Sequence, residues 1–271
     1  RINLPAHPFR ALDLDTEPGR FDGIATGSAA LLAAPAGRLL AAAGRPEGIV
    51  TGYGPLAPCK DLATGLPLLE LPPGFSYRTL GWTGSPMAGD APTPGAHDGM
   101  GVVAARDGRI VLVRNHEVVS DTGAFGPSVI QYDAACGGGT LTLEIDAKDG
   151  SLVSARPSLS GTLQNCAGGT TPRGTWLTCE EYVYEEPQPK AVGIDSLARP
   201  LNRLVREHGF VFEVHPAGDR APVALEAMGQ FRHEAAVTHA ATGDVYLTED
   251  REPRAGFYRF VPTRKDDLAA G

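Results

Sequence analysis

Three stretches of the chain show the same order of polar and apolar positions. Each has a polar pair, an alternating apolar strand, a turn, a second strand and then an acid, at residues 97–117, 165–181 and 233–250. Alternation with a period of two, interrupted by turn residues, is typical of β-hairpins. The starts of successive stretches are 68 residues apart, so the sequence predicts one hairpin repeated almost in register.

A second kind of segment follows each hairpin and doubles the number of strands per repeat. Each begins with Gly and an alternating apolar strand and then turns, at residues 139–155, 209–229 and 256–268. Four-stranded antiparallel units repeated at a fixed period are typical of β-propeller blades. The sequence therefore predicts an all-β protein, a β-propeller, with strands near residues 100–106, 109–114, 139–145, 174–178, 209–214 and 244–248.

The number of repeats predicts that the ring is incomplete. The 271 residues hold two full units and half of a third, whereas propellers typically have about four blades or more. Either C-terminal blades are missing from this chain or other chains complete the ring, and we favour the first. We also expect a strand edge without a partner near residues 256–262.

The first part of the chain lacks the repeat. We expect residues 1–70 to form an irregular N-terminal extension that wraps the main body, and residues 71–271 to form the N-terminal part of the propeller domain. The Ala- and Leu-rich segment 28–44 predicts one or two short helices within this extension. Alternation starts again near residues 75–80, and residues 185–207 read as an insertion with a possible short helix.

Composition excludes several classes of function. The net charge is −8 and no basic run occurs, which argues against nucleic acid and anionic membranes as partners. No uncharged apolar stretch is long enough for a membrane-spanning helix. The four cysteines have no C-x-x-C spacing, and no G-x-S-x-G motif is present, which argues against a zinc ribbon, a dithiol redox pair and a serine hydrolase.

Acids gather at the open end of the three predicted hairpins. Folding each hairpin about its turn sets three pairs roughly opposite one another: Asp98 and Glu117, Asn165 and Glu180, and Glu234 and Glu249, with Glu181 and Asp250 at the same level. Carboxylates this close together favour a bound cation, and Ca²⁺ prefers such oxygen ligands. The alternative is that these acids are solvated or paired with Arg251 and Arg254.

Cys166 adds a thiolate to this set of oxygen ligands. Mixed soft and hard ligands suit a transition metal better than calcium alone. A cross-strand disulfide with Cys179 and an inert buried thiol are the alternatives. His97, His116 and His233 recur at the same ends, as ligands or as structural residues. Asn115 and Asn165 can each donate to a phosphate oxygen or cap a strand, and we favour Asn165 as the site residue.

Two long motifs and several short ones occur in a fixed order over about residues 70–262. They are NCAGGTTPRGTWLTCEE (165–181), HEAAVTHAATGDVYLTED (233–250), LPPGF (71–75), HDGM (97–100), NHE (115–117), HGFVFEV (208–214), MGQFRHEA (228–235) and GFYRFVP (256–262). In this order they resemble the PhoX-type alkaline phosphatases. The resemblance implies a β-propeller hydrolase, periplasmic or secreted after twin-arginine export, that hydrolyses phosphomonoesters with an iron–calcium cluster.

The resemblance also implies roles for individual residues. Cys166 matches the cysteine that binds iron, and Glu234 matches a glutamate that bridges iron and calcium. The remaining candidates are the metal ligands Glu180, Glu181, Glu249 and Asp250 and the catalytic residues Asn165 and His233. The chain departs from the family at Arg173, where an aromatic residue is common.

Other ligands in the family come from later blades, so we expect this 271-residue segment to be inactive by itself. Two other classes remain open. One is a calcium-dependent lactonase or esterase propeller without a thiolate ligand, and the other is a non-catalytic, calcium-stabilised binding scaffold.

Overall fold

The computed structural model describes residues 9–11, 53–183, 201, 203–265 and 267–270. The chain divides into two units, one of residues 13–79 and one of residues 1–12 with 80–271. The described residues form short antiparallel strands and two 3₁₀ turns, and they include no α-helix. This confirms the all-β prediction. The helices predicted within 28–44 lie outside the described residues, as does most of the insertion at 185–207.

The smaller unit contains one short hairpin. β2 (Ala57–Cys59) pairs with β3 (Leu69–Leu71) in antiparallel register. Nearby, the buried Asp61 carboxylate accepts hydrogen bonds from the backbone and hydroxyl groups of Thr64 and Thr79. No strand forms over residues 75–80, although their alternation pointed to one.

The first sheet of the larger unit is a four-stranded meander. Its strands, in spatial order, are β4 (His97–Arg106), β5 (Arg109–His116), β6 (Gly138–Asp146) and β7 (Leu152–Thr162). Asp107 and Gly108 both have positive φ, of 52° and 70°, which suits a tight two-residue hairpin turn. The turn thus lies where Asp followed by Gly favours one.

The second sheet has three strands. They are β8 (Asn165–Thr170), β9 (Trp176–Glu180) and β10 (Val211–Val214), and a single bridge from Phe212 to Ala224 stands where a fourth strand was predicted. The Asn165–Glu180 pairing predicted from the turn position is present in the structure.

The third sheet draws its fourth strand from the start of the chain. β11 (His233–Thr238), β12 (Val245–Glu249) and β13 (Phe257–Phe260) form a meander, and β1 (Phe9–Ala11) pairs with the outer edge of β13. The prediction of an unpaired edge near 256–262 is therefore wrong. An edge strand offers free backbone N–H and C=O groups to any partner, and here the partner lies far away in the sequence.

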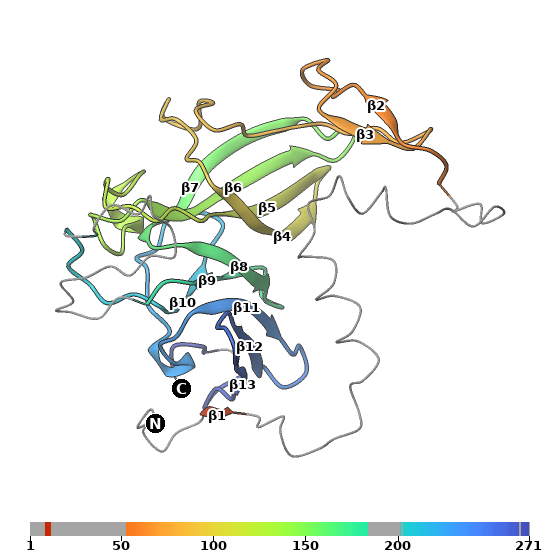
Figure 1. Cartoon of the computed structure of the whole chain (residues 1–271). Coiled ribbons are helices and arrows are strands. Elements are labelled where there is room, and N and C mark those ends of the chain that lie inside the picture. Colours follow the sequence, from red (N-terminus) through yellow and green to blue (C-terminus); the bar gives the residue numbers. More distant parts are fainter. Residues whose placement is uncertain (1–8, 12–52, 184–200, 202, 266, 271) are drawn as a thin grey trace. The chain divides into compact units, whose positions relative to one another are not determined.

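The three sheets follow one another along the larger unit (Figure 1). β4, β8 and β11 begin at the three residues that are 68 positions apart, and β8 packs against both β4 and β11. Antiparallel sheets of three or four strands whose first strands lie side by side are consistent with consecutive propeller blades.

Alternating side chains of β9 fill the two spaces between the sheets. Trp176 packs with Val113 and Phe212 between the first and second sheets. Leu177 packs with Leu247 and Phe260 between the second and third sheets. This period of two is the physical basis of the hairpin prediction, because each strand of the middle sheet must bury both of its faces.

Two glycines let the first strands approach one another closely. A Cβ atom at Gly99 of β4 would lie 2.8 Å from the Cα of Ala167, and one at Gly169 of β8 would lie 1.8 Å from the carbonyl oxygen of Ala236. No side chain fits at either position without a backbone shift. The glycines therefore let β4 approach β8 closely, and β8 approach β11.

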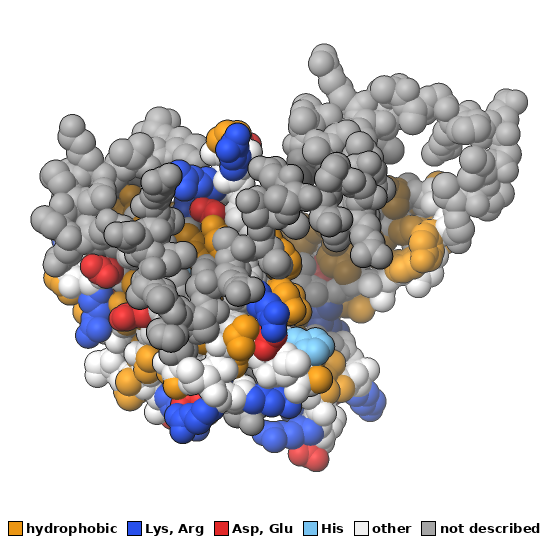
Figure 2. Space-filling view, turned by 90° about the horizontal axis from the view of Figure 1, so that it is seen from below, with side chains coloured by type: hydrophobic (Ala, Val, Ile, Leu, Met, Phe, Trp, Pro, Cys, Tyr) orange, Lys and Arg blue, Asp and Glu red, His pale blue; other side chains and the backbone are white. Residues whose placement is uncertain are grey.

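The surface of the described residues is mixed in character. Figure 2 shows basic, acidic and hydrophobic side chains interspersed over one face. Among the residues that the structure describes, no helix is long and apolar enough to cross a membrane.

Candidate metal centre

The first strand of each of the three sheets begins with the same irregularity. His97, Asn165 and His233 pair with the last residue of the following strand, and the register then shifts before residues 100, 168 and 236. Such β-bulges turn side chains away from the regular alternation and are common beside functional sites. The first residues within the three bulges are Asp98, Cys166 and Glu234.

In each of the three sheets, an acid directly follows the second strand, and its backbone makes the same hydrogen bond in all three. The backbone N–H groups of these acids donate to the carbonyl group of the residue that precedes the bulged strand. The three bonds run from Glu117 to Ala96 at 2.8 Å, from Glu181 to Gln164 at 2.9 Å and from Asp250 to Arg232 at 3.0 Å. The hairpins thus fix three acids in one repeated geometry.

These two sets of residues converge at one place. The Cys166 thiol and carboxylate oxygens of Glu181 and Glu234 lie within 4.8 Å of one another. The side chains of Glu117 and Asp98 also lie beside each other, as do those of Glu181 and Asp250. We call the six side chains Asp98, Glu117, Cys166, Glu181, Glu234 and Asp250 the acid cluster.

The electrostatics of the acid cluster favour a bound cation. Burial and neighbouring acids raise the pKa values of Glu117 and Glu234, and burial with Asp250 raises the pKa of Glu181 to about 7. Burial and the nearby Cys179 and Glu234 also raise the pKa of the Cys166 thiol well above its usual range. Burial and the neighbouring acids thus make ionisation of Glu117, Glu181, Glu234 and Cys166 costly, and a bound cation would stabilise their ionised forms.

Glu181 is expected to make Ca²⁺ stabilise the protein more strongly as pH rises. The pKa of Glu181 is raised from 4.5 to about 7, so its contribution to the free energy of unfolding of the cation-free protein falls through this range. The buried His116 and His233, whose pKa values burial lowers to about 4, act in the opposite direction with and without a cation. We expect saturating Ca²⁺ to raise the unfolding temperature by roughly 5 °C more at about pH 8 than at about pH 5 in differential scanning calorimetry, and an equal rise at both pH values would contradict this explanation.

The structure does not bring Glu180 and Glu249 into the acid cluster, although both were candidate ligands. Glu180 points to the other side of its strand, where it accepts a hydrogen bond of 2.7 Å from Nδ1 of His208. Glu249 accepts hydrogen bonds from the backbone of Gly256 and the hydroxyl group of Tyr258. In each acidic pair, Glu180–Glu181 and Glu249–Asp250, only the second residue faces the cluster.

Asn165 and His233 have structural partners. The Asn165 amide is fully buried, accepts from the Thr162 hydroxyl at 2.6 Å and donates to the Thr178 hydroxyl at 3.1 Å. Nε2 of His233 lies 3.1 Å from the carbonyl oxygen of Gly229, and burial lowers the pKa of this histidine to about 4. Both residues begin a bulged strand, and their catalytic roles stay predictions.

Asn115 supports the bulge that carries Cys166. Its amide donates to the carbonyl oxygens of Cys166 at 3.0 Å and of Ala167 at 2.8 Å, and its own oxygen accepts from the Trp176 indole at 2.9 Å. His97 and His116 hydrogen-bond the backbone of Pro94 and Gly95. All three side chains thus contact backbone carbonyl groups.

The cysteines are free thiols. Cys166 and Cys179 are both buried and form no disulfide. The Cys166 sulfur lies 3.2 Å from the carbonyl oxygen of His233 and 3.5 Å from that of Glu234, so the thiol donates its proton to the neighbouring bulge. The disulfide considered from the sequence is not formed.

Asp133, Cys136 and His208 form a second buried group of metal-binding side chains. Burial alone would lower the pKa of His208, but Glu180 and Asp133 raise it to about 12. A protonated imidazole has no lone pair for a metal, and Asp133 already accepts hydrogen bonds from three backbone N–H groups. In this structure the group therefore forms a closed hydrogen-bonded network.

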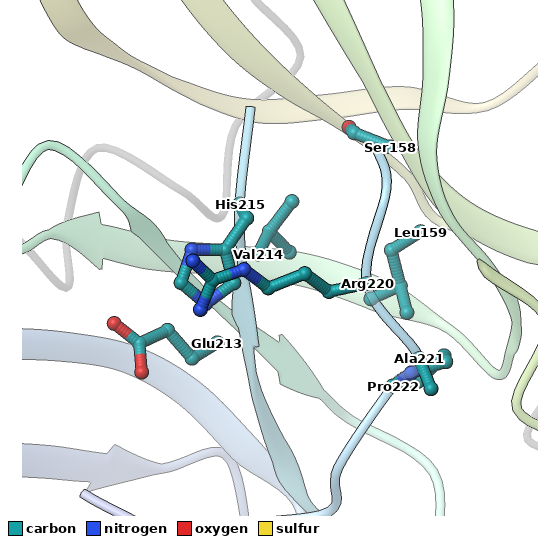
Figure 3. A pocket seen from close by; sticks show the side chains of 8 residues that line it. All are labelled: Ser158, Leu159, Glu213, Val214, His215, Arg220, Ala221 and Pro222. Atoms are coloured by element: carbon teal, nitrogen blue, oxygen red, sulfur yellow. The ribbon is translucent and has the colours of Figure 1, made fainter. Parts of the chain in front are cut away.

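A small pocket lies at the other end of β10 (Figure 3). It is lined by Ser158, Leu159, Glu213, Val214, His215, Arg220, Ala221 and Pro222. Val214 pairs with Trp176 near the hairpin turn, whereas Val211 pairs with Cys179 at the end that carries the acid cluster. The pocket is thus separate from the cluster.

Comparison with known proteins agrees with this geometry. The family model described as alkaline phosphatase PhoX matches residues 51–158 and 151–269, which together are well over half of the chain. The acid cluster lies entirely within the matched residues. No curated protein and no solved structure matches the chain. The chain belongs to the PhoX family of alkaline phosphatases.

Proposed function

We propose that the protein is a phosphomonoesterase whose iron–calcium centre is held by the acid cluster. The proposal rests on the way in which the three sheets supply the side chains of the cluster. Three successive sheets each contribute a bulge residue and a strand-end acid, and all six side chains meet at one place. A fold that repeats its ligands in this way holds several cations close together.

The donor types support two kinds of metal ion. Cys166 offers a thiolate, which suits iron, and Glu181 and Glu234 lie close enough to complete its ligand set. Asp98, Glu117 and Asp250 add further carboxylates, the ligands that calcium prefers. When bound, such a centre supplies positive charge for the phosphate oxygens and lowers the pKa of a bound water molecule.

The protein's own groups prepare the site for a dianionic phosphoester. The bound metal ions would outweigh the negative charge of the carboxylates, which would reverse the local charge and let an acidic chain bind phosphate. Asn115 holds the carbonyl groups of the Cys166 bulge, so the sulfur is fixed in place before any ligand arrives. This prearrangement lowers the entropic cost of assembling the centre.

The family resemblance supports three further parts of the proposal. The protein would be periplasmic or secreted, with residues 71–271 forming part of a propeller. Met100 and Val102 on β4 and Val237 on β11 are more than half exposed, at 52%, 51% and 65%, as expected if further blades cover them. Those blades would supply the remaining ligands.

Metal removal and replacement test this proposal. Purified full-length protein should hydrolyse p-nitrophenyl phosphate, lose that activity after chelation and regain it only when iron and calcium are both added. Elemental analysis of the same sample separates the alternatives, because calcium alone would support a lactonase or esterase and no metal would support a binding scaffold. Full phosphatase activity in a metal-free sample would overturn the proposal.

A further inference from the structure

Gln164 occupies a repeated position directly before a bulged strand. Its counterpart in the third sheet is Arg232, 68 residues later. Both residues use their carbonyl groups to hold the backbone of a cluster acid, Glu181 for Gln164 and Asp250 for Arg232. Their side chains also donate hydrogen bonds to acids of the cluster.

The side chain of Gln164 joins acids from two neighbouring sheets. Its Nε2 atom donates to Oε1 of Glu117 at 3.2 Å and to Oε2 of Glu181 at 3.0 Å. Glu117 follows the second strand of the first sheet, and Glu181 follows that of the second sheet. A single amide group therefore sets the separation of two candidate metal ligands.

Arg232 repeats this arrangement one sheet further on. Its Nη2 atom donates to Oε1 of Glu181 at 2.7 Å and lies 3.9 Å from Oδ2 of Asp250. Both oxygens of Glu181 are thus held, one by Gln164 and the other by Arg232. The equivalent residue of the first sheet is Ala96, which holds Glu117 by its carbonyl group but has no polar side chain, so the bridge occurs at two of the three equivalent positions.

The backbone of Gln164 is strained. Its φ angle is +51°, in the left-handed region that Gly and Asn adopt more easily than other residues. Strain of this kind persists where the surroundings maintain it and is common at functional sites. The backbone therefore does not account for a glutamine here, whereas the reach of its side chain to both acids does.

We propose that Gln164 is a positioning residue that holds Glu117 and Glu181 at the separation required by the metal centre. The inference rests on the proposed function of the acid cluster as that centre. Hydrogen bonds to metal ligands fix their orientation, and their loss commonly lowers metal affinity by ~10–100-fold. Gln164 itself is not a ligand and does not take part in the chemical step.

Gln164→Asn separates a positioning role from a structural one. Asn is more favourable than Gln at positive φ, but its side chain is one methylene shorter and cannot reach both carboxylates. We expect the unfolding temperature of the chelator-treated variant to be unchanged or raised. Its affinity for Ca²⁺ alone, measured by isothermal titration calorimetry on the full chain, should fall ~10–100-fold.

A second glutamine of the chain, Gln131, provides a matched control. Gln131→Asn shortens a glutamine that donates only to the carbonyl oxygen of Gly126, so it should leave Ca²⁺ affinity unchanged. Unchanged affinity in Gln164→Asn, or a parallel loss of stability in the metal-free state, would overturn the inference alone. A wild-type chain that binds no Ca²⁺ would overturn both the inference and the metal centre.

Discussion

Replacing Cys166 by Ser is expected to remove iron from the protein and to lower kcat/KM for p-nitrophenyl phosphate by at least ~100-fold. A serine hydroxyl has nearly the same size but keeps its proton near neutral pH, so it cannot supply the anionic sulfur ligand that a transition metal favours. The variant should still fold, because Cys166 forms no disulfide and the bulge is held by the Asn115 amide. Iron content and turnover measured on the same preparation check the prediction.

Two control variants separate ligand loss from damage to the packing. Cys179→Ser changes another buried thiol on the same hairpin, which is absent from the groups that could hold a metal, and should keep its iron. Glu234→Gln should lose metal and activity, whereas Glu249→Gln should keep both because its carboxylate faces Tyr258. Full iron and full turnover in Cys166→Ser would return this cysteine to the role of an inert buried thiol.

Replacing Glu180 by Gln is expected to destabilise the folded protein by ~3–5 kcal/mol. The carboxylate is fully buried and accepts four hydrogen bonds, from His208 Nδ1 and from the backbone N–H groups of Leu163, Gly209 and Phe210. A glutamine amide directs N–H donors at groups that are themselves donors. It also leaves the positive charge on His208 without its closest partner.

Denaturant unfolding of Glu180→Gln beside Glu144→Gln measures this effect. Glu144 pairs with Arg156 at 2.7 Å, and both side chains are 31% exposed, so its loss should cost less than about 1 kcal/mol. A similar small loss for both variants would show that the buried network contributes no more than a surface ion pair.

The sequence predicted the hairpins well because a period of two reports directly which side chains share a face. Spacing placed the starts of β4, β8 and β11, and the Asn165–Glu180 pairing followed from the turn. The pairing of β1 with β13 could not be predicted in this way. β1 and β13 are far apart in the sequence, and a strand of three residues shows too little alternation to be recognised.

Site prediction was limited by local backbone geometry. Cys166, Glu181, Glu234 and Asp250 come together in the structure, whereas Glu180 and Glu249 turn away. Adjacent acids at a strand end are ambiguous, because a shift of one residue reverses the face. In the structure, the β-bulges and the backbone hydrogen bonds from Glu181 and Asp250 to the residues before the bulged strands determine which acid of each pair faces the cluster.

The sequence predicts Asp98 and Glu117 as a facing pair, but they are not among the predicted ligands. The first hairpin has neither the cysteine nor the long motifs that drew attention to the other two. Their positions are nevertheless equivalent to Cys166 and Glu181, and the spacing of 68 residues between Asp98 and Cys166 was the available signal. Gln164 had no sequence signal, because its role depends on a left-handed backbone.

The most direct test of the metal centre is an anomalous difference map from crystals of the protein, recorded on both sides of the iron absorption edge. We expect an iron peak between the Cys166 sulfur and the carboxylates of Glu181 and Glu234. Weaker density for calcium should lie toward the remaining acids of the cluster. A map with no iron peak there, in crystals grown from catalytically active protein, would contradict the proposed metal centre.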